Sequence, residues 1–296
     1  MQLKQIFYFY ENGGSKMTAL ITGGTGQLGS ELRKLLDEKQ VAYVSVGSKE
    51  LDITNVEAVN QLILELKPEI IYHCAAYTAV DAAEDEGKDL NQAVNVIGTE
   101  NVAKAAEGVG ATLVYISTDY VFDGMNHGEY KETDKTNPQS EYGRAKLAGE
   151  QAVQKLVSKY YIVRTSWVFG EFGKNFVFTM QRLAETHPTL TVVADQIGRP
   201  TWTHTLAEFV LYLFKNKSEY GIYHLSNEGS CSWYEFAKEI LKDTDVEIVP
   251  VTSEEYPQKA NRPKHSIMDL SKAKSTGFEI STWQEVLKIF KEQNGM

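Results

Sequence analysis

The chain has 296 residues, enough for one large domain or two of ordinary size, and it can bury a core without disulfides or structural metals. Hydrophobic residues make up 42% of it and charged residues 24%, the balance of a globular protein rather than of a disordered one. Lys and Arg total 30 against 40 Asp and Glu, so the formal net charge is −10. General affinity for nucleic acid or an anionic membrane surface is therefore not expected.

The two cysteines, Cys74 and Cys231, cannot form a disulfide framework, and the sequence has no CxxC or HExxH spacing. We therefore assign no metal and expect a cytoplasmic protein that does not enter a membrane. The apolar stretch 206–214 is far shorter than the ~20 residues that span a bilayer. Residues 1–16 are too polar for a secretory signal, and a second Met follows them, so we interpret them as a non-essential leader.

From Met17 onward, short β-branched segments alternate with longer amphipathic ones. This alternation predicts right-handed βαβ units, and hence an α/β fold with a Rossmann-type doubly wound parallel sheet covered by helices on both faces. The predicted strands are 18–22, 42–46, 70–74, 112–117 and 160–165, and the predicted helices are 30–38, 56–66 and 81–107.

Beyond residue 170 the pattern becomes less regular and richer in proline, with short candidate strands at 221–225 and 246–251. We therefore expect a first domain at 17–170 and a smaller C-terminal α/β lobe at 171–296. Some segments of the second half could return to the first domain.

A glycine-rich turn follows the first strand directly, with the spacing G-x-x-G-x-x-G. Such a turn lets the backbone approach a pyrophosphate and aims a helix N-terminus at the phosphates; a turn without a ligand is the alternative. The first domain is thus predicted to bind NAD(P), through Gly23, Gly24, Thr25, Gly26, Gln27, Leu28 and Gly29.

The end of the second strand bears on the choice of cofactor. An NAD-specific site usually places an acidic group there for the ribose 2′-hydroxyl, and no carboxylate stands at 46–49. Ser48 and Lys49 could instead accept a 2′-phosphate, which favours NADPH over NADH; a merely solvated Lys49 is the alternative. Asp52 and Ile53 could contact the adenine.

Tyr142 and Lys146 lie one helical turn apart, so an ammonium group can sit near a phenol and lower its pKa of about 10. YxxxK alone also describes an exposed Tyr and a solvated Lys. Thr118 closes the fourth strand, and ligands of doubly wound sheets bind beyond the carboxyl ends of the strands. The hydroxyl, phenol and ammonium groups should therefore converge beside the nicotinamide.

The segments TGGTGQLG, AAYTAVDAAE, STDYVFDG, YGRAK and RTSWVFG resemble, in this order, the extended short-chain dehydrogenase/reductases and among them the dTDP-4-dehydrorhamnose reductase family. The resemblance runs from about residue 18 to the C-terminus. It implies reduction of the 4-keto group of dTDP-4-dehydro-β-L-rhamnose with NADPH or NADH, which gives dTDP-L-rhamnose for cell-surface polysaccharide.

The resemblance also implies roles for single residues. Tyr142 would be the proton donor, Lys146 its activator and a ribose ligand, and Thr118 the hydroxyl that orients the keto group. Asp119 and Trp167 would lie near the sugar. Along the cofactor it places Ala75, Ala76, Tyr77 and Asn95, together with Tyr142 and Lys146, although Asn95 also fits an ordinary polar position on a helix.

The loops at 195–201 and 261–266 resemble family loops around the sugar nucleotide. Their cations Arg199, Arg262 and Lys264 are candidates for binding a diphosphate, with simple solvation as the alternative. Asn175 could seat the nucleotide or cap a helix.

Two other functions stay open. The same site could belong to another nucleotide-sugar enzyme such as an epimerase or a 4,6-dehydratase, although dehydratases carry an Asp-Glu pair after the Thr, where this chain has Asp119-Tyr120. A relative of the family is a non-catalytic regulatory subunit of methionine adenosyltransferase. We expect a nucleotide sugar as partner, no nucleic acid or membrane, and a monomer or homodimer.

Overall fold

The computed structural model describes residues 19–296, so the leader predicted at 1–16 lies outside the described residues. Its centre is a six-stranded sheet with the strand order β10-β5-β4-β3-β1-β2, in which all neighbouring strands are parallel. The predicted α/β class is confirmed. The strands are β1 (Ala19–Thr22), β2 (Tyr43–Val46), β3 (Ile70–His73), β4 (Thr112–Thr118), β5 (Tyr160–Thr165) and β10 (Gly221–His224).

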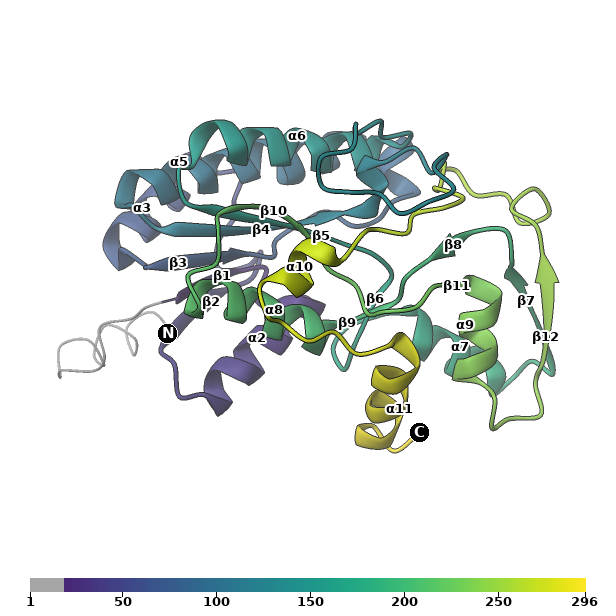
Figure 1. Cartoon of the computed structure of the whole chain (residues 1–296). Coiled ribbons are helices and arrows are strands. Elements are labelled where there is room, and N and C mark those ends of the chain that lie inside the picture. The colour runs from purple at the N-terminus through teal and green to yellow at the C-terminus, as the bar shows by residue number, and fades with distance from the viewer. Residues whose placement is uncertain (1–18) are drawn as a thin grey trace.

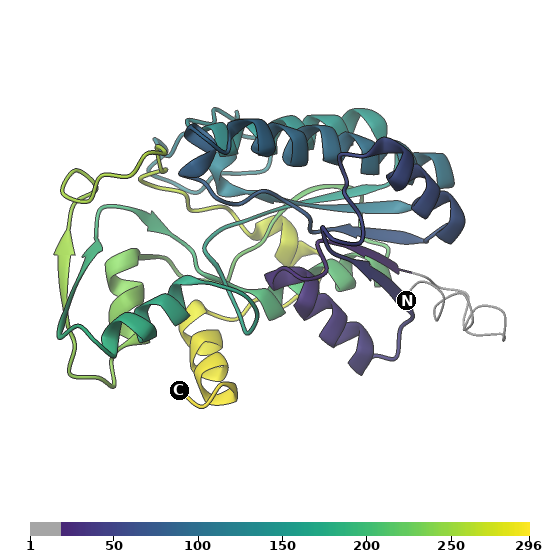
Figure 2. The ribbon, with the colours of Figure 1, turned by 180° about the vertical axis from the view of Figure 1, so that it is seen from behind.

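Helices cover both faces of this sheet (Figures 1 and 2). One face packs against α2 (Gln27–Glu38) and α8 (Thr203–Lys215), and the other against α3 (Val56–Leu66), α5 (Thr99–Val109) and α6 (Glu141–Leu156). Each strand therefore contributes side chains to two apolar layers, and its sequence is almost continuously apolar, as buried parallel strands are.

The order of the strands reverses at β1, which lies between β2 and β3. At such a reversal a crevice opens beyond the carboxyl ends of the strands. Gly23 lies there with φ +68°, and a Cβ on it would be 2.5 Å from the backbone nitrogen of Ala75. Only glycine permits this contact between the turn after β1 and the chain after β3.

The helix predicted at 81–107 is wrong in its start and in its continuity. A 3-10 turn at Ala82–Glu84 comes first, followed by α4 (Lys88–Gln92), a π-helix at Ala93–Gly98 and then α5. At Gly98, where the π-helix ends, the chain lies close to Ile53, because a Cβ on Gly98 would be 2.6 Å from that side chain. π-helical turns are often found at functional sites, and this one carries Asn95.

Two glycines seat α6 closely on β4. Ser140 caps the helix by accepting a hydrogen bond from the Gly143 nitrogen at 3.1 Å. A Cβ on Gly143 would collide with the Tyr120 carbonyl oxygen, and a Cβ on Gly149 with the Tyr115 hydroxyl. The first half of α6 therefore lies directly against β4 and the turn that follows it.

A smaller lobe lies beyond the carboxyl edge of the sheet (Figure 1) and has its own apolar core. The segment predicted at 221–225 is not part of it, because β10 pairs with β5 in the central sheet. The predicted strand at 246–251 is found as β12 (Glu247–Val251), paired with β7 (Thr189–Val193). The other elements of the lobe are β6 (Val168–Phe169), β8 (Ile197–Gly198), β9 (Thr201–Trp202), β11 (Cys231–Ser232), α7 (Phe176–Ala184), α9 (Trp233–Ile240) and α11 (Trp283–Gln293), whereas α10 (Ser271–Ser275) packs on β10 of the central sheet.

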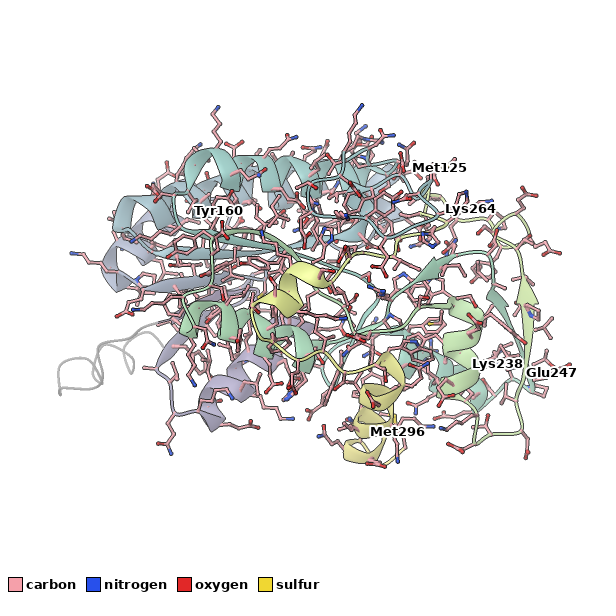
Figure 3. The ribbon with its side chains drawn as sticks, viewed as in Figure 1. Met125, Tyr160, Lys238, Glu247, Lys264 and Met296 are labelled. Carbon is pink, nitrogen blue, oxygen red and sulfur yellow. The ribbon has the colours of Figure 1, made fainter. Side chains whose placement is uncertain are left out.

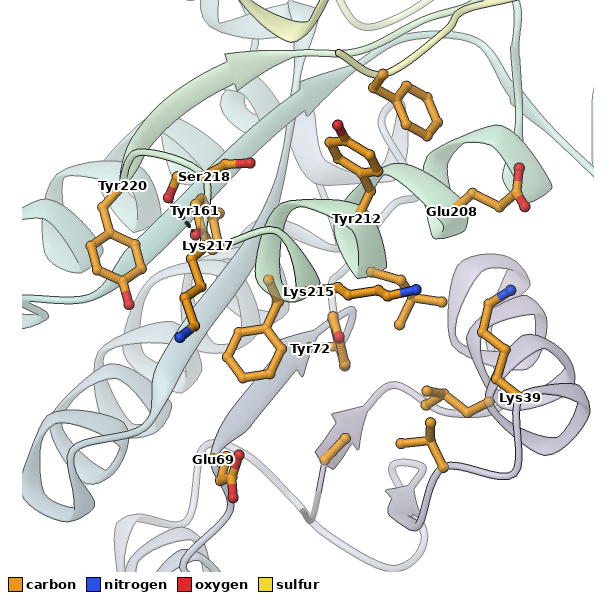
Figure 4. A pocket seen from close by; sticks show the side chains of 16 residues that line it. Lys39, Glu69, Tyr72, Tyr161, Glu208, Tyr212, Lys215, Lys217, Ser218 and Tyr220 are labelled. Atoms are coloured by element: carbon orange, nitrogen blue, oxygen red, sulfur yellow. Dashed lines mark hydrogen bonds between the residues drawn. The ribbon is translucent and has the colours of Figure 1, made fainter. Parts of the chain in front are cut away.

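At the amino ends of the strands, a cavity of about 960 Å³ lies between α2 and α8 (Figure 4). Aromatic side chains such as Tyr72 and Phe214 line it, with Lys39 and Lys215 beside it. It lies at the opposite end of the sheet from the crevice.

Replacing Gly149 by Ala tests the close packing of α6 on β4. Because the added methyl group collides with the Tyr115 hydroxyl and lies 2.8 Å from the Asn95 carbonyl oxygen, we expect the free energy of unfolding to fall by about 1–3 kcal/mol in urea denaturation. Gly108→Ala is the matched control, since nothing lies within 4 Å of its added Cβ in α5. It should raise stability by about 0.5–1 kcal/mol. Equal effects of the two substitutions would contradict the seating.

Candidate active site

Three of the predicted side chains converge at the carboxyl end of β4. Thr118 is the last residue of that strand, and its hydroxyl donates to Asp119 Oδ1 at 3.0 Å and accepts from the Tyr120 nitrogen at 3.2 Å. Tyr142 lies in the first turn of α6, where the Thr118 hydroxyl is near enough to its phenol to lower the pKa. Lys146 follows one turn later, so all three border one site.

Lys146 is 2% exposed, and its Nζ lies 4.0 Å from the centre of the Tyr115 ring. Burial lowers its pKa to about 7, while the carboxylate of Glu150, one turn further along α6, acts in the opposite direction. Glu150 is held by Arg164, with N–O distances of 2.9 and 2.7 Å. The ammonium group thus lies on an aromatic face above a buried ion pair.

The phenol of Tyr142 behaves differently from the sequence-based expectation. Loss of solvent raises its pKa above the usual 10, and the neighbouring Asp119 and Tyr120 raise it further. The expected lowering by Lys146 is not found in the free protein, where desolvation of the phenolate is the largest effect. Tyr142 therefore carries its proton at neutral pH, which suits a group that donates one.

Asp119 is a buried carboxyl group beside this phenol. Burial raises its pKa to about 6, while the hydrogen bond from Thr118 and the nearby Ser266 hydroxyl act against the shift. Its Oδ2 has no hydrogen-bond partner within residues 19–296. Asp119 thus presents an unused acceptor near the reacting groups.

The side chain of Asn95 holds the backbone of Tyr77 through two hydrogen bonds. Its side chain accepts from the Tyr77 nitrogen at 3.1 Å and donates to the Tyr77 carbonyl at 2.9 Å. It also donates to Asn91 Oδ1, and Asn91 in turn donates to the Glu141 carbonyl at 3.0 Å. The pair therefore connects the loop after β3 to the start of α6. Sequence reasoning missed Asn91, although its spacing of four from Asn95 is a signal for a shared helix face.

The crevice at the sheet reversal fits a dinucleotide. A Cβ on Gly24 would collide with the Ser45 side chain, and a Cβ on Gly29 would collide with the Gly23 carbonyl oxygen. Glycine at both positions therefore lets the backbone of the turn pack closely on its neighbours. Arg33 donates to the Gly24 carbonyl at 3.3 Å, a contact that the sequence did not predict. The predicted residues lie in this turn (Gly23, Gly24, Thr25 and Gly26) and in the first turn of α2 (Gln27, Leu28 and Gly29).

Some of the other predicted cofactor contacts border the same crevice, and others do not. Ser48 and Lys49 are exposed in the turn after β2, and Ala75, Ala76 and Tyr77 follow β3. Asp52 is exposed, but its carboxylate accepts from the nitrogen and hydroxyl of Thr54. Ile53 is buried in the apolar layer under α3 and α5.

On the lobe side, Trp167 has an unusual backbone conformation with φ +48°. Its ring stacks on Trp233 at 3.6 Å, and Gly198 lies so near that a Cβ there would be 2.6 Å from the indole. Trp233 was not predicted.

Asn175 caps α7: its side chain accepts a hydrogen bond from the Phe178 nitrogen and donates one to the Gly170 carbonyl. Both contacts stabilise the start of the helix, so the side chain of Asn175 has a structural role.

The two candidate arginines of the lobe are held by partners. Arg262 donates to the Tyr120 hydroxyl at 2.8 Å and to Asp81 Oδ2 at 2.6 Å. The Tyr120 ring packs edge-on against the Tyr142 ring, with centres 5.6 Å apart, so Arg262 lies close to the site.

Arg199 donates to Glu129 and to the Met268 carbonyl. Lys264, labelled in Figure 3, is 66% exposed, and its Nζ is 3.8 Å from Asp195. Arg262 is therefore the candidate cation that reaches the reacting groups.

Within the described part of the chain, no group of three or more His, Cys, Asp or Glu side chains is arranged to hold a metal ion. No helix among the same residues is both long and apolar enough to cross a bilayer.

A Rossmann sheet with a tyrosine, a lysine and a threonine at its carboxyl edge defines the class of the short-chain dehydrogenase/reductases. The family model described as the RmlD substrate binding domain matches residues 17–294, and the chain belongs to this family. It is 43% identical to dTDP-4-dehydrorhamnose reductase of Aggregatibacter actinomycetemcomitans over 91% of this chain and 96% of the relative.

Comparison with solved structures agrees with this family assignment. A dTDP-4-dehydrorhamnose reductase from Clostridium acetobutylicum superposes with a TM-score of 0.91 at 47% identity, covering 95% of this chain and all of that one. The Bacillus anthracis enzyme, crystallised in complex with NADP, superposes with 0.90 at 45% identity over 94% of this chain and all of its own.

The buried Lys146 makes stability depend on pH. Its pKa is about 7 in the folded chain against 10.5 for an ordinary lysine. Above pH 7 the folded protein loses a proton that the unfolded chain keeps, so the wild type should gain stability relative to Lys146→Met, by up to about 1.4 kcal/mol per pH unit, as pH rises from 7 towards 10. Urea unfolding of both proteins at pH 6, 7, 8 and 9 measures this. A constant difference across that range would contradict the low pKa.

Proposed function

We propose that the protein reduces the C4 keto group of dTDP-4-dehydro-β-L-rhamnose to dTDP-β-L-rhamnose with NAD(P)H, the last step in making this sugar donor for cell-surface polysaccharide. One observation carries the proposal: the phenol of Tyr142, the buried amine of Lys146 and the hydroxyl of Thr118 lie at the same carboxyl edge of the sheet as the glycine turn that fits a dinucleotide. The relatives that share most of the chain are named for this reaction.

When bound, NAD(P)H supplies the hydride that the C4 carbonyl receives. The chain contributes the remaining steps. Thr118 donates a hydrogen bond to the keto oxygen and holds it within reach of the phenol. Tyr142 gives its proton to the oxygen as negative charge develops there, so that an alcohol forms. Lys146 holds the ribose and stabilises the phenolate that remains, an electrostatic contribution made in a site with little water.

The lobe residues hold the sugar nucleotide in this proposal. Trp167 and Asp119 border the sugar, and Arg262 exchanges its contact with Asp81 for the diphosphate of the substrate. The opposite charges of the Arg262 guanidinium group and the diphosphate favour this exchange, because a guanidinium group binds phosphate oxygens through paired hydrogen bonds. We place the enzyme in the cytoplasm, where its two cysteines stay reduced, as a monomer or homodimer.

Substitution of Tyr142 by Phe tests the proton donor. The phenyl ring keeps the packing against Tyr120 but has no proton to give, so turnover of dTDP-4-dehydro-β-L-rhamnose should fall about 10²–10⁴-fold. NADPH and NADH oxidation by the purified proteins is followed by absorbance, in parallel. Binding of either cofactor should change little, because the phenol contributes no charge to it.

Tyr160→Phe is the control, since it removes a phenol hydroxyl at the amino end of β5, far from the carboxyl edge that carries the site, and it should keep the turnover. Wild-type protein that binds cofactor but leaves this sugar unreduced would contradict the proposal. Turnover of a different nucleotide sugar would then favour an epimerase or another reductase. Recovery of a stoichiometric methionine adenosyltransferase would favour the regulatory role.

Arg262→Met tests the diphosphate contact. Because it removes a cation that would pair with phosphate, we expect the KM for the sugar nucleotide to rise about tenfold while kcat changes less. Lys264→Met removes a charge from the same loop at an exposed position and should leave KM nearly unchanged. A KM equally insensitive to both substitutions would remove Arg262 from the substrate site.

A further inference from the structure

The turn after β2 places the carboxylate of Glu50 at the end of this strand, although no carboxylate stands at 46–49 in the sequence. Gly47 is the first residue after β2, and its nitrogen donates to Glu50 Oε2 at 2.9 Å. The backbone nitrogens of Glu50 and Leu51 both donate to the Gly47 carbonyl, at 3.2 and 3.0 Å, which folds the chain back on itself. The carboxylate therefore returns to the end of the strand.

Its location relative to the glycine turn is defined by two contacts. A Cβ on Gly47 would lie 3.0 Å from Glu50 Oε2 and 3.0 Å from the Thr25 hydroxyl. The nitrogen of Gly24, next to Thr25, donates to the Val46 carbonyl at 3.0 Å. Glu50 thus occupies nearly the space that a side chain at position 47 would take, at the corner between the glycine turn and β2.

This corner is where a Rossmann site holds the 2′ position of the adenosine ribose. An acidic group at the end of the second strand accepts a hydrogen bond from the 2′-hydroxyl of NADH, whereas a nearby cation accommodates the 2′-phosphate of NADPH. A cation is also present, because Arg33 of α2 reaches the same turn and donates to the Gly24 carbonyl. The two side chains have opposite preferences for the two cofactors.

We propose that Glu50 is a determinant of cofactor choice, accepting from the 2′-hydroxyl of NADH and repelling the 2′-phosphate of NADPH, with Arg33 opposing it. The inference rests on the proposed NAD(P)H site. The balance of the two side chains lets the chain use both cofactors, and removing either one shifts the choice in a known direction.

Glu50→Gln is the central variant. The amide keeps an oxygen that accepts from the Gly47 nitrogen, so the turn is preserved while the negative charge is lost. NADH and NADPH binding is titrated by nicotinamide fluorescence without sugar, which separates binding from turnover. We expect the ratio of the Kd for NADH to the Kd for NADPH to rise about three- to tenfold, as the loss of one partly exposed charge interaction allows.

The shift should shrink at higher salt, because exposed charges are screened. Arg33→Met should move the ratio in the opposite direction by a similar factor. Glu65→Gln removes an exposed carboxylate from α3 and serves as the control, with no change in the ratio expected.

If both cofactors bind but the ratio is the same in wild type and Glu50→Gln, Glu50 only stabilises its turn and the inference is overturned, while the proposed function stands. Failure of the wild type to bind either cofactor would instead overturn the proposed function.

Discussion

The close approach of α6 to β4 is the constraint on which the candidate site depends. The hydroxyl that ends β4 and the phenol and ammonium of α6 come from different elements, so they meet only if the helix lies almost directly on the strand. Gly143 and Gly149 make this possible, since a side chain at either would collide with Tyr120 or Tyr115. Asn91 adds a hydrogen bond from the neighbouring helix to the first residue of α6. The glycines of this helix are therefore as much a part of the site as its polar residues.

Burial gives the same groups their chemistry. The low-dielectric surroundings oppose every charge, so they lower the pKa of Lys146 and raise those of Tyr142 and Asp119. The molecule offsets part of this cost through the face of Tyr115 and the carboxylate of Glu150, which both favour the ammonium. The result is a lysine and a carboxyl group that titrate within about a unit of neutral pH, next to a phenol that stays protonated.

The lobe is joined to the sheet at the edge of the same site. Arg262 links the C-terminal segment to Asp81 after β3 and to Tyr120 after β4, and Tyr120 packs against Tyr142. A ligand that draws Arg262 away would therefore act on the neighbourhood of the phenol. This arrangement couples the part of the chain that is proposed to recognise the nucleotide with the part that carries the chemistry.

The layer architecture and the main cofactor elements could be predicted from the sequence, because both depend on local patterns. Short apolar strands alternate with amphipathic helices, and the glycine spacing at 23–29 requires a particular turn at a particular place. Tyr142 and Lys146 could likewise be paired from the spacing of one helix, and Thr118 from its position at the end of a strand.

Features that depend on contacts between distant segments could not be predicted from local patterns and are seen only in the folded chain. The π-helix at Ala93–Gly98 interrupts a segment that its local pattern predicted as one helix, and β10 joins the central sheet beside β5. Glu50 stands three residues beyond the position where a carboxylate is usually sought, and only the fold of its turn returns it to the end of β2. The pKa of Tyr142 could not be predicted either, because the sequence shows the nearby cation but not that desolvation and the neighbouring Asp119 and Tyr120 raise the pKa of the phenol.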